Sequence, residues 1–231
     1  MKFKILVANR GEIAVRIIRA AHELGLEAVA VYSEADRDAL FVRYADQAVC
    51  IGPAPLAESY LFYQNILAAA KSTGADAIHP GYGFLSENAS FAEACRVLNI
   101  TFIGPQPMAI RKMGDKAMAK KIMREAGVPV VPGSEGVLAS CEEARALADE
   151  ICYPVIFKAW AGGGGRGMRI VAEKKELENA FNSASNEAQK AFGDASVSLE
   201  TYIPDPTHIE SQVLGDKQGR AGHLFERDCS V

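Results

Sequence analysis

Continuous apolar runs alternate with helix-period segments over the first hundred residues, and this alternation limits the folds available to the chain. The runs at 4–9 and 27–32 lack polar alternation, which is typical of strands buried on both faces of a sheet. Between them, residues 11–25 repeat apolar side chains at helical spacing and end at Gly25, a residue type that commonly terminates helices. Strands that alternate with helices favour parallel pairing, so we predict an α/β fold with a doubly wound, Rossmann-like sheet.

The same pattern predicts more elements before residue 105: strands at 47–52, 75–80 and 100–105, and helices at about 60–71 and 89–98. After Pro107 the pattern becomes mixed α+β. It predicts helices at 115–127, 141–150 (with Ser140 and Glu143 as a capping box) and 174–192, strands at 153–160, 167–172 and 196–203, and a hairpin of 208–216 with 221–231. We therefore predict two domains, residues 1–112 and 113–231, with a glycine-rich subdomain at 130–203.

Composition excludes several function classes. A net charge of -4 gives no electrostatic reason to expect nucleic acid. No apolar run approaches the roughly 20 residues that span a membrane, and the amino terminus does not resemble an export signal. The five cysteines show no CxxC or metal-ligand spacing and are interpreted as reduced thiols. We expect a cytoplasmic protein with no membrane or nucleic-acid partner.

Four consecutive glycines at 162–165 stand between two predicted strands. A glycine-rich hairpin can fold over phosphates, because amides without side chains approach phosphate oxygens closely. The run can equally be a flexible hairpin tip. Lys158 and Arg166 flank the glycines and favour the phosphate interpretation. The order strand, glycines, strand differs from a Walker P-loop, which runs from a strand into a helix.

Other candidates are ambiguous when taken singly. The first turn has Gly11 alone and not G-x-G-x-x-G, which argues against NAD. His79 and Glu87 lie in "HPGYGFLSEN" after a predicted strand, where ligands of open α/β sheets bind, but either can be an ordinary loop residue. Lys116 near a helix start and Glu200 at a strand end are, alone, typical solvated residues.

Together these segments resemble biotin carboxylase, the ATP-grasp enzyme of acetyl-CoA, propionyl-CoA and pyruvate carboxylases. The resemblance covers the whole chain and is carried by seven stretches in order: "ANRGEIAVRIIRA" (8–20), "HPGYGFLSEN" (79–88), "FIGP" (102–105), "RKMGDK" (111–116), "GVPVVPG" (127–133), "GGGGRGMRIV" (162–171) and "ERDCS" (226–230). It implies a biotin carboxylase amino-terminal domain at 1–112 and a partial ATP-grasp domain at 113–231, with 130–203 as the lid.

The resemblance implies ATP-dependent carboxylation of biotin on a carrier protein. Bicarbonate is activated as carboxyphosphate with Mg²⁺ or Mn²⁺, and lid closure protects that intermediate from water. The resemblance also implies roles for ten residues: phosphate contacts from Lys116, Lys158, Gly164 and Gly165, adenine contacts from Met168 and from the hinge Glu200, Thr201, Tyr202 and Ile203, and a ribose contact from His208.

This sequence departs from the family pattern at Trp160, commonly a small residue, and at Thr201, more usually lysine. The family's metal-binding acids and bicarbonate-holding arginines are expected beyond Val231, so no catalytic residue or metal ligand is expected within the chain, and we expect no turnover by it alone.

The implied partners are the biotin carrier protein, a carboxyltransferase and a second subunit of a homodimer. Arg19 and Glu23 are candidate interface residues, or an ordinary i, i+4 surface ion pair. Two other functions stay open: an ATP-grasp ligase acting on bicarbonate or urea without biotin, and a non-catalytic ATP-binding or dimerisation fragment.

Overall fold

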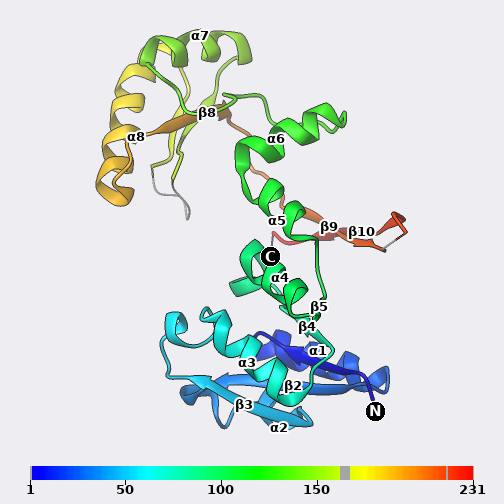
Figure 1. The fold of residues 1–231 in the computed structure, drawn as a ribbon. Coiled ribbons are helices and arrows are strands. Elements are labelled where there is room, and N and C mark those ends of the chain that lie inside the picture. Colours follow the sequence, from blue (N-terminus) through cyan, green and yellow to red (C-terminus); the bar gives the residue numbers. More distant parts are fainter. Residues whose placement is uncertain (1, 162–166, 217, 231) are drawn as a thin grey trace. The chain divides into compact units, whose positions relative to one another are not determined.

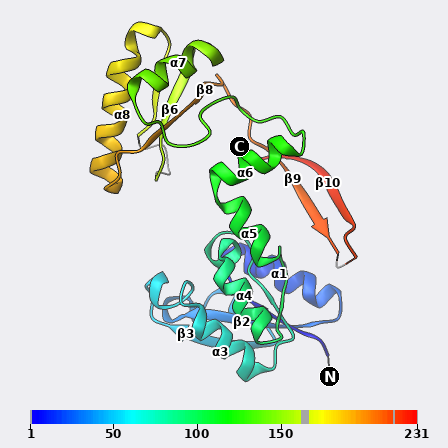
Figure 2. The same ribbon diagram turned by 45° about the horizontal axis from the view of Figure 1, so that its top comes forward.

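The computed structural model describes residues 2–161, 167–216 and 218–230, and the chain divides into two compact units, Met1–Ile122 and Met123–Val231 (Figure 1). Figure 2 shows the same elements from a second direction. Each unit has its own hydrophobic core and its own sheet.

Unit 1 contains a five-stranded parallel sheet in the order β3-β2-β1-β4-β5, which confirms the predicted α/β class. Leu6 and Val7 of β1 are fully buried, because helices cover both faces of the sheet. The strands are β1 (Lys4–Val7), β2 (Glu27–Ser33), β3 (Gln47–Gly52), β4 (Ala77–His79) and β5 (Thr101–Phe102).

Successive side chains of the strands point to opposite faces, and each face has its own helices. Ile5 and Val7 pack with α1 and α2, whereas Leu6 and Ala8 pack with α3 and α4. The helices of this part are α1 (Gly11–Glu23), α2 (Leu40–Tyr44), α3 (Tyr63–Thr73), α4 (Ala89–Val97), α5 (Pro107–Gly114) and α6 (Lys116–Glu125), whose end lies in unit 2. We did not predict α2 or α5. Both are too short to show a helical period, although Pro107 in the first turn of α5 is a favourable helix start.

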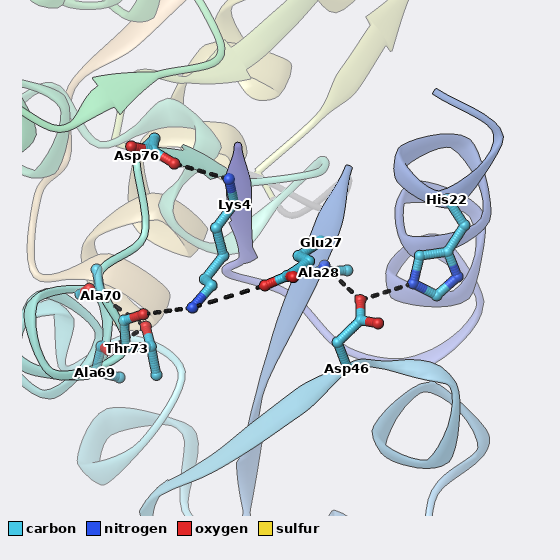
Figure 3. A network of polar contacts seen from close by, with 9 residues as sticks. All are labelled: Lys4, His22, Glu27, Ala28, Asp46, Ala69, Ala70, Thr73 and Asp76. Atoms are coloured by element: carbon cyan, nitrogen blue, oxygen red, sulfur yellow. Dashed lines mark hydrogen bonds and ion pairs between the residues drawn. The ribbon is translucent and has the colours of Figure 1, made fainter. Parts of the chain in front are cut away.

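Polar contacts hold the amino ends of the central strands (Figure 3). The backbone N–H of Lys4 donates to Asp76 at 2.8 Å. The Lys4 ammonium donates to the Thr73 carbonyl at 2.8 Å and lies 3.8 Å from the Glu27 carboxylate. This lysine therefore ties β1 to the end of α3 and to β2 at the edge of the sheet opposite the strands' carboxyl ends.

Asp46 makes a similar contact between helix and sheet (Figure 3). Its carboxylate accepts from the Ala28 N–H at 2.8 Å and lies 2.9 Å from His22 Nε2. The Ala28 amide, helped by His22, lowers the pKa of Asp46 although partial burial opposes the shift. These groups satisfy one another's hydrogen-bonding capacity, and their role is structural.

Unit 2 contains an antiparallel sheet in the order β7-β6-β8, with helices on one face. Phe157 and Leu199 are fully buried against those helices, whereas Ile156 and Lys158 alternate to the opposite face. The elements are α7 (Cys141–Ile151), β6 (Val155–Ala159), β7 (Arg169–Val171), α8 (Leu177–Phe192) and β8 (Val197–Thr201).

The predicted cap of α7 is present in a modified form. Ser140 accepts from the Glu143 N–H at 3.3 Å, as a capping box requires. The Glu143 carboxylate, however, accepts from Ala139, one residue before the cap, at 2.7 Å. The reciprocal bond is therefore shifted by one residue.

The connector after α6 pairs with the outer edge of β8. The Thr201 N–H donates to the Pro132 carbonyl at 2.9 Å, and the Ser134 N–H donates to the Leu199 carbonyl at 2.8 Å. This pairing covers an edge strand that would otherwise expose unpaired backbone groups.

The predicted hairpin is also present, as β9 (Ile209–Gly215) antiparallel to β10 (Ala221–Asp228). All five cysteines are free. Within the described residues, no helix combines the length and apolar character needed to cross a membrane.

Gly133 allows the close approach of the connector to β8. A Cβ at this position would lie 2.4 Å from the Leu199 carbonyl oxygen and 2.9 Å from the Glu200 Cα, both backbone atoms that cannot turn aside. We expect Gly133→Ala to lower the free energy of unfolding by about 2 kcal/mol. Urea denaturation measures this. Gly136→Ala is the matched control, because nothing lies within 4 Å of the place that its methyl group would take, and equal losses in both variants would contradict the steric argument.

Candidate functional site

The strand order reverses at β1, which lies between β2 and β4. Ligands of open α/β sheets bind outside the carboxyl ends of the strands at such a point. Here Asn9, only 3% exposed, donates from its amide nitrogen to the Pro80 and Tyr82 carbonyls, each at 2.8 Å. Asn9 thus holds the loop after β1 against the loop after β4. Gly81 has φ +67°, and a Cβ there would lie 2.8 Å from the Asn9 amide nitrogen.

The structure places His79 at the end of β4, where its Nδ1 accepts from the Gly81 N–H at 3.0 Å. Burial lowers the pKa of His79, so the neutral ring with its proton on Nε2 is favoured. Glu87 is exposed at the end of the short 3₁₀ helix Phe84–Glu87. Among the described residues no hydrogen bond or ion pair brings Glu87 to His79.

A partly buried polar cluster follows β2 and was not foreseen from the sequence. The Tyr60 hydroxyl donates to Asp36 at 2.7 Å and accepts from the Ser33 N–H at 3.1 Å, and Arg10 contacts the other Asp36 oxygen at 2.5 Å. The Tyr60 ring stacks on Phe84 with centroids 5.7 Å apart. The cluster therefore contacts the loop after β4 through this stacking of Tyr60 on Phe84. The polar residues directly after the β2 run were the available sequence signal.

The cluster shifts two pKa values. Burial acts to raise the pKa of Asp36, but hydrogen bonds from Tyr60 and Arg10 outweigh it and the pKa falls below the usual aspartate value. Burial, with the neighbouring Asp36 carboxylate, raises the pKa of Tyr60. The cluster therefore holds an ionised carboxylate and a neutral phenol at neutral pH.

In unit 2 the structure brings together Lys158 and Glu200, whose Nζ and Oε2 atoms are 2.5 Å apart. The register pairs Ile156 with Glu200 and Lys158 with Ser198, so the two charged residues are diagonal neighbours on the open face of the sheet. The Lys158 side chain is 41% exposed and that of Glu200 only 14%.

The predicted hinge after Glu200 offers few free backbone donors. The N–H groups of Thr201 and Tyr202 are used by the carbonyls of Pro132 and Pro154, each at 2.9 Å. In the part of the chain that the structure describes, the Ile203 N–H has no hydrogen-bond acceptor, and the buried Thr201 hydroxyl has no partner either. Among the residues of the predicted hinge, Ile203 is therefore the one whose amide has no acceptor in the described parts of the chain.

The remaining candidates lie in several places. Met168 is exposed just before β7. The backbone N–H of Trp160 donates to the Ser196 carbonyl at 2.9 Å, so this residue continues the pairing of the sheet. His208 precedes β9, and its backbone N–H donates to the Ser230 hydroxyl at 2.7 Å. Lys116 is the first residue of α6, as predicted. Gly164 and Gly165 lie outside the described residues.

Arg19 and Glu23 are both exposed on α1. Among the described residues no ion pair joins them, so the surface-pair interpretation has no support. No group of three His, Cys, Asp or Glu side chains in the described parts is arranged to hold a metal ion.

Two family matches divide the chain. Residues 115–231 match the family "Carbamoyl-phosphate synthase L chain, ATP binding domain", which places this part in a class of ATP-binding domains. Residues 1–110 match "Biotin carboxylase, N-terminal domain". The chain belongs to the biotin carboxylase family.

Individual relatives support the same family assignment. The chain is 58% identical to Biotin carboxylase 1 of Bacillus subtilis over 99% of its own length and 51% of that protein. It resembles a Campylobacter jejuni biotin carboxylase–β,γ-ATP complex with TM-score 0.87 and 56% identity, over 99% of this chain and 51% of that one. It also resembles the 2-oxoglutarate carboxylase biotin carboxylase domain dimer of Hydrogenobacter thermophilus, solved with MgADP, ADP and bicarbonate, with TM-score 0.85 and 55% identity, over 100% and 51%. The chain spans about half the length of these relatives.

The lowered pKa of Asp36 predicts a specific acid response. Its contribution to stability is fully present above the unfolded-state aspartate pKa of about 4 and is lost as pH falls through the lower folded-state value. We expect the difference in unfolding free energy between the unmodified chain and Asp36→Asn to be constant above about pH 5 and to shrink below about pH 4. Urea denaturation across this range measures the difference.

Asp38→Asn is the control, because Asp38 is exposed and makes no hydrogen bond or ion pair with the described residues. A difference for Asp36→Asn that stays flat down to about pH 2.5 would show that the cluster does not depend on the ionised carboxylate.

Proposed function

We propose that this chain forms the amino-terminal domain and part of the ATP-binding domain of an enzyme that carboxylates biotin on a carrier protein, using ATP and bicarbonate through carboxyphosphate. The observation that carries the proposal is the match to biotin carboxylases at 57–58% identity along the whole chain. The relatives solved with β,γ-ATP, and with MgADP and bicarbonate, support ATP, Mg²⁺ and bicarbonate as ligands of the complete enzyme. Mn²⁺ in place of Mg²⁺ is part of the proposal.

The proposed nucleotide site uses the open sheet face of unit 2. Lys158 would contact phosphate, and the Ile203 amide and the Glu200 carboxylate would read the adenine. Met168 would pack against the base, with Thr201 and Tyr202 shaping the hinge through backbone. Lys116 and the amides of Gly164 and Gly165 would contact phosphate, and His208 the ribose. We assign no metal ligand, because the described residues contain no cluster that fits one.

The loop after β4 is proposed separately as a ligand-binding loop of unit 1. His79 can donate from Nε2, since its Nδ1 already accepts a hydrogen bond. Glu87 is exposed at the same carboxyl edge of the sheet, where ligands of such folds bind. Roles for both residues are part of the proposal.

The proposed partners are a biotin carrier protein or domain, a carboxyltransferase and a second copy of the complete chain. The dimer of the Hydrogenobacter thermophilus domain supports the last of these. Arg19 and Glu23 are suited to an interface, since both are exposed on α1 and are not paired with each other. The proposal names no final acceptor, because relatives include 2-oxoglutarate and pyruvate carboxylase subunits.

A biotin-independent ligase is the second candidate, because the ATP-binding half matches a family named for carbamoyl-phosphate synthase. The match of residues 1–110 to the biotin carboxylase amino-terminal domain favours the first candidate. Stimulation of turnover of the complete enzyme by free biotin separates the two.

The chain as it stands should bind ATP without turning it over. We expect ATP with Mg²⁺ to raise its melting temperature, and no bicarbonate-dependent ADP release with or without free biotin. A coupled ADP assay and thermal unfolding measure the two effects. Robust biotin-stimulated ADP release would show that these 231 residues are sufficient for chemistry, and an unchanged melting temperature would contradict nucleotide binding by this chain.

Lys116 provides a sharper test of the phosphate contacts. We expect Lys116→Met to weaken ATP binding by about tenfold or more, because a charge-assisted contact to phosphate is lost. A positive charge at the first residue of α6 is not favoured by the helix dipole, and thermal unfolding of the variant without ATP checks that its fold is retained. Calorimetric titration measures binding. Lys112→Met in α5 is the control. If ATP binding is weakened equally in both variants, the effect comes from the general loss of positive charge and not from a contact of Lys116 with phosphate.

A further inference from the structure

The Arg169 side chain joins the first residue of β7 both to helix α8 and to the backbone that precedes the strand. Its Nε donates to the Ser183 hydroxyl at 3.4 Å, and its Nη2 lies 2.5 Å from the Glu187 carboxylate. Its Nη1 donates to the Met168 carbonyl at 2.8 Å. Each nitrogen of one planar guanidinium therefore has a different partner, a geometry that the rigid fork of arginine provides and the single ammonium of lysine does not.

Two of these partners lie on one face of α8. Ser183 and Glu187 are one helical turn apart, so both can contact the same guanidinium. The helix is itself fixed in unit 2, because its Ala184 and Ala188 are fully buried. The guanidinium is therefore held by a helix that packs in the core, and its third contact extends this anchorage to the backbone carbonyl of Met168.

Met168 lies where strand pairing no longer fixes the backbone. In the part of the chain that the structure describes, the last pair of the β6–β7 ladder is Phe157 with Arg169. On the other side of Met168, Gly167 has φ +70°, and a Cβ there would lie 2.7 Å from the Ala159 Cβ. The close packing of Gly167 and the guanidinium of Arg169 therefore hold the Met168 peptide in place of a strand pair.

Alternation along β7 turns Arg169 and Met168 to opposite faces of the sheet. Val171 is fully buried with the helices, and Arg169 contacts α8 on that same face. Ile170 is exposed on the opposite face, and the same period places the exposed side chain of Met168 there. Arg169 thus holds the backbone of a residue whose side chain is on the open face, while its own charge stays at the helix.

We propose that Arg169 is a positioning residue for binding of the nucleotide base. Its guanidinium holds the Met168 backbone to α8, so that the Met168 side chain presents a fixed surface to the base. The inference rests on the proposed nucleotide site, in which Met168 packs against adenine. Without the arginine fork the Met168 peptide must be ordered when the base binds, and that ordering opposes binding. The phosphate contacts come from other residues and are unaffected.

The alternative is that Arg169 contributes only a surface ion pair to the packing of α8. Such pairs add little when they are partly exposed, and the Arg169 side chain is 42% exposed. Arg145 is the matched comparison, because its side chain is 41% exposed and also pairs with a carboxylate on α8, Glu178, at 3.4 Å. Among the described residues Arg145 has no hydrogen bond to a backbone carbonyl. A purely structural role would make the two arginines equivalent.

The first measurement needs no nucleotide. Arg169→Lys keeps a positive charge beside Glu187, but its single ammonium cannot also hold the Met168 carbonyl in the same geometry. We expect the NMR order parameters of the backbone amides at Met168 and at position 169 to fall in this variant. Arg145→Lys should leave both unchanged. Unchanged order parameters in Arg169→Lys would contradict the positioning role.

The second measurement compares binding of ATP and of inorganic tripolyphosphate to the 231-residue chain by calorimetric titration. We expect Arg169→Lys to weaken ATP binding by about threefold to tenfold, the size expected for one charge-assisted hydrogen bond at a partly exposed site. Tripolyphosphate binding should stay the same, since it has no base. Arg145→Lys should change neither affinity, and both variants should keep the melting temperature of the unmodified chain because lysine retains the charge.

The outcomes separate this inference from the proposed nucleotide site. If the unmodified chain binds ATP and Arg169→Lys keeps the ratio of the two affinities, the positioning role is wrong and the nucleotide site stands. If Arg169→Lys lowers the melting temperature and weakens both ligands equally, Arg169 only supports the fold and the positioning role is again wrong. If the unmodified chain binds neither ligand, the proposed nucleotide site fails, and a role of Arg169 in base binding fails with it.

Discussion

Both neighbours of β1 run parallel to it, and each connection between parallel strands must return across a face of the sheet. β1 is consequently covered on both sides, which explains why Leu6 and Val7 are fully buried. The two ends of the sheet then take different roles. Lys4 and Asp46 tie the amino ends through structural contacts, while the loops that meet at Asn9 form the carboxyl edge, where a ligand has access.

The antiparallel sheet of unit 2 differs from the sheet of unit 1, because its helices pack on one face. Alternation along β6 buries Phe157 against the helices and turns Lys158 outward. The connector then pairs with the edge of β8, so the backbone of this strand is hydrogen-bonded on both sides. Lys158 is 41% exposed on the face opposite the helices, and Glu200 beside it is only 14% exposed. A charged pair on a strand that is fixed at both edges is suited to holding a ligand in one orientation.

The local sequence pattern was sufficient to predict much of the fold, but it predicted less of the candidate site. The runs of β1 and β2, the cap at Ser140 and the final hairpin were predicted because each depends on neighbouring residues. The cluster of Asp36 with Tyr60 was not, because it joins side chains that only the tertiary fold brings together. The partnership of Lys158 with Glu200 likewise depends on strand register, which residue types alone do not specify. The roles of Gly164 and Gly165 stay predictions.

The two polar clusters differ in the kind of groups that contact their carboxylates. Asp36 accepts from Tyr60, Ser33 and Arg10 together, so three side chains from separate parts of the chain fix its position. Glu200 pairs with Lys158, a flexible ammonium on the neighbouring strand. The two cations are similarly accessible, since the Arg10 side chain is 43% exposed and that of Lys158 is 41% exposed. The difference between the clusters therefore lies in the chemistry of the partners and not in the exposure of the cation.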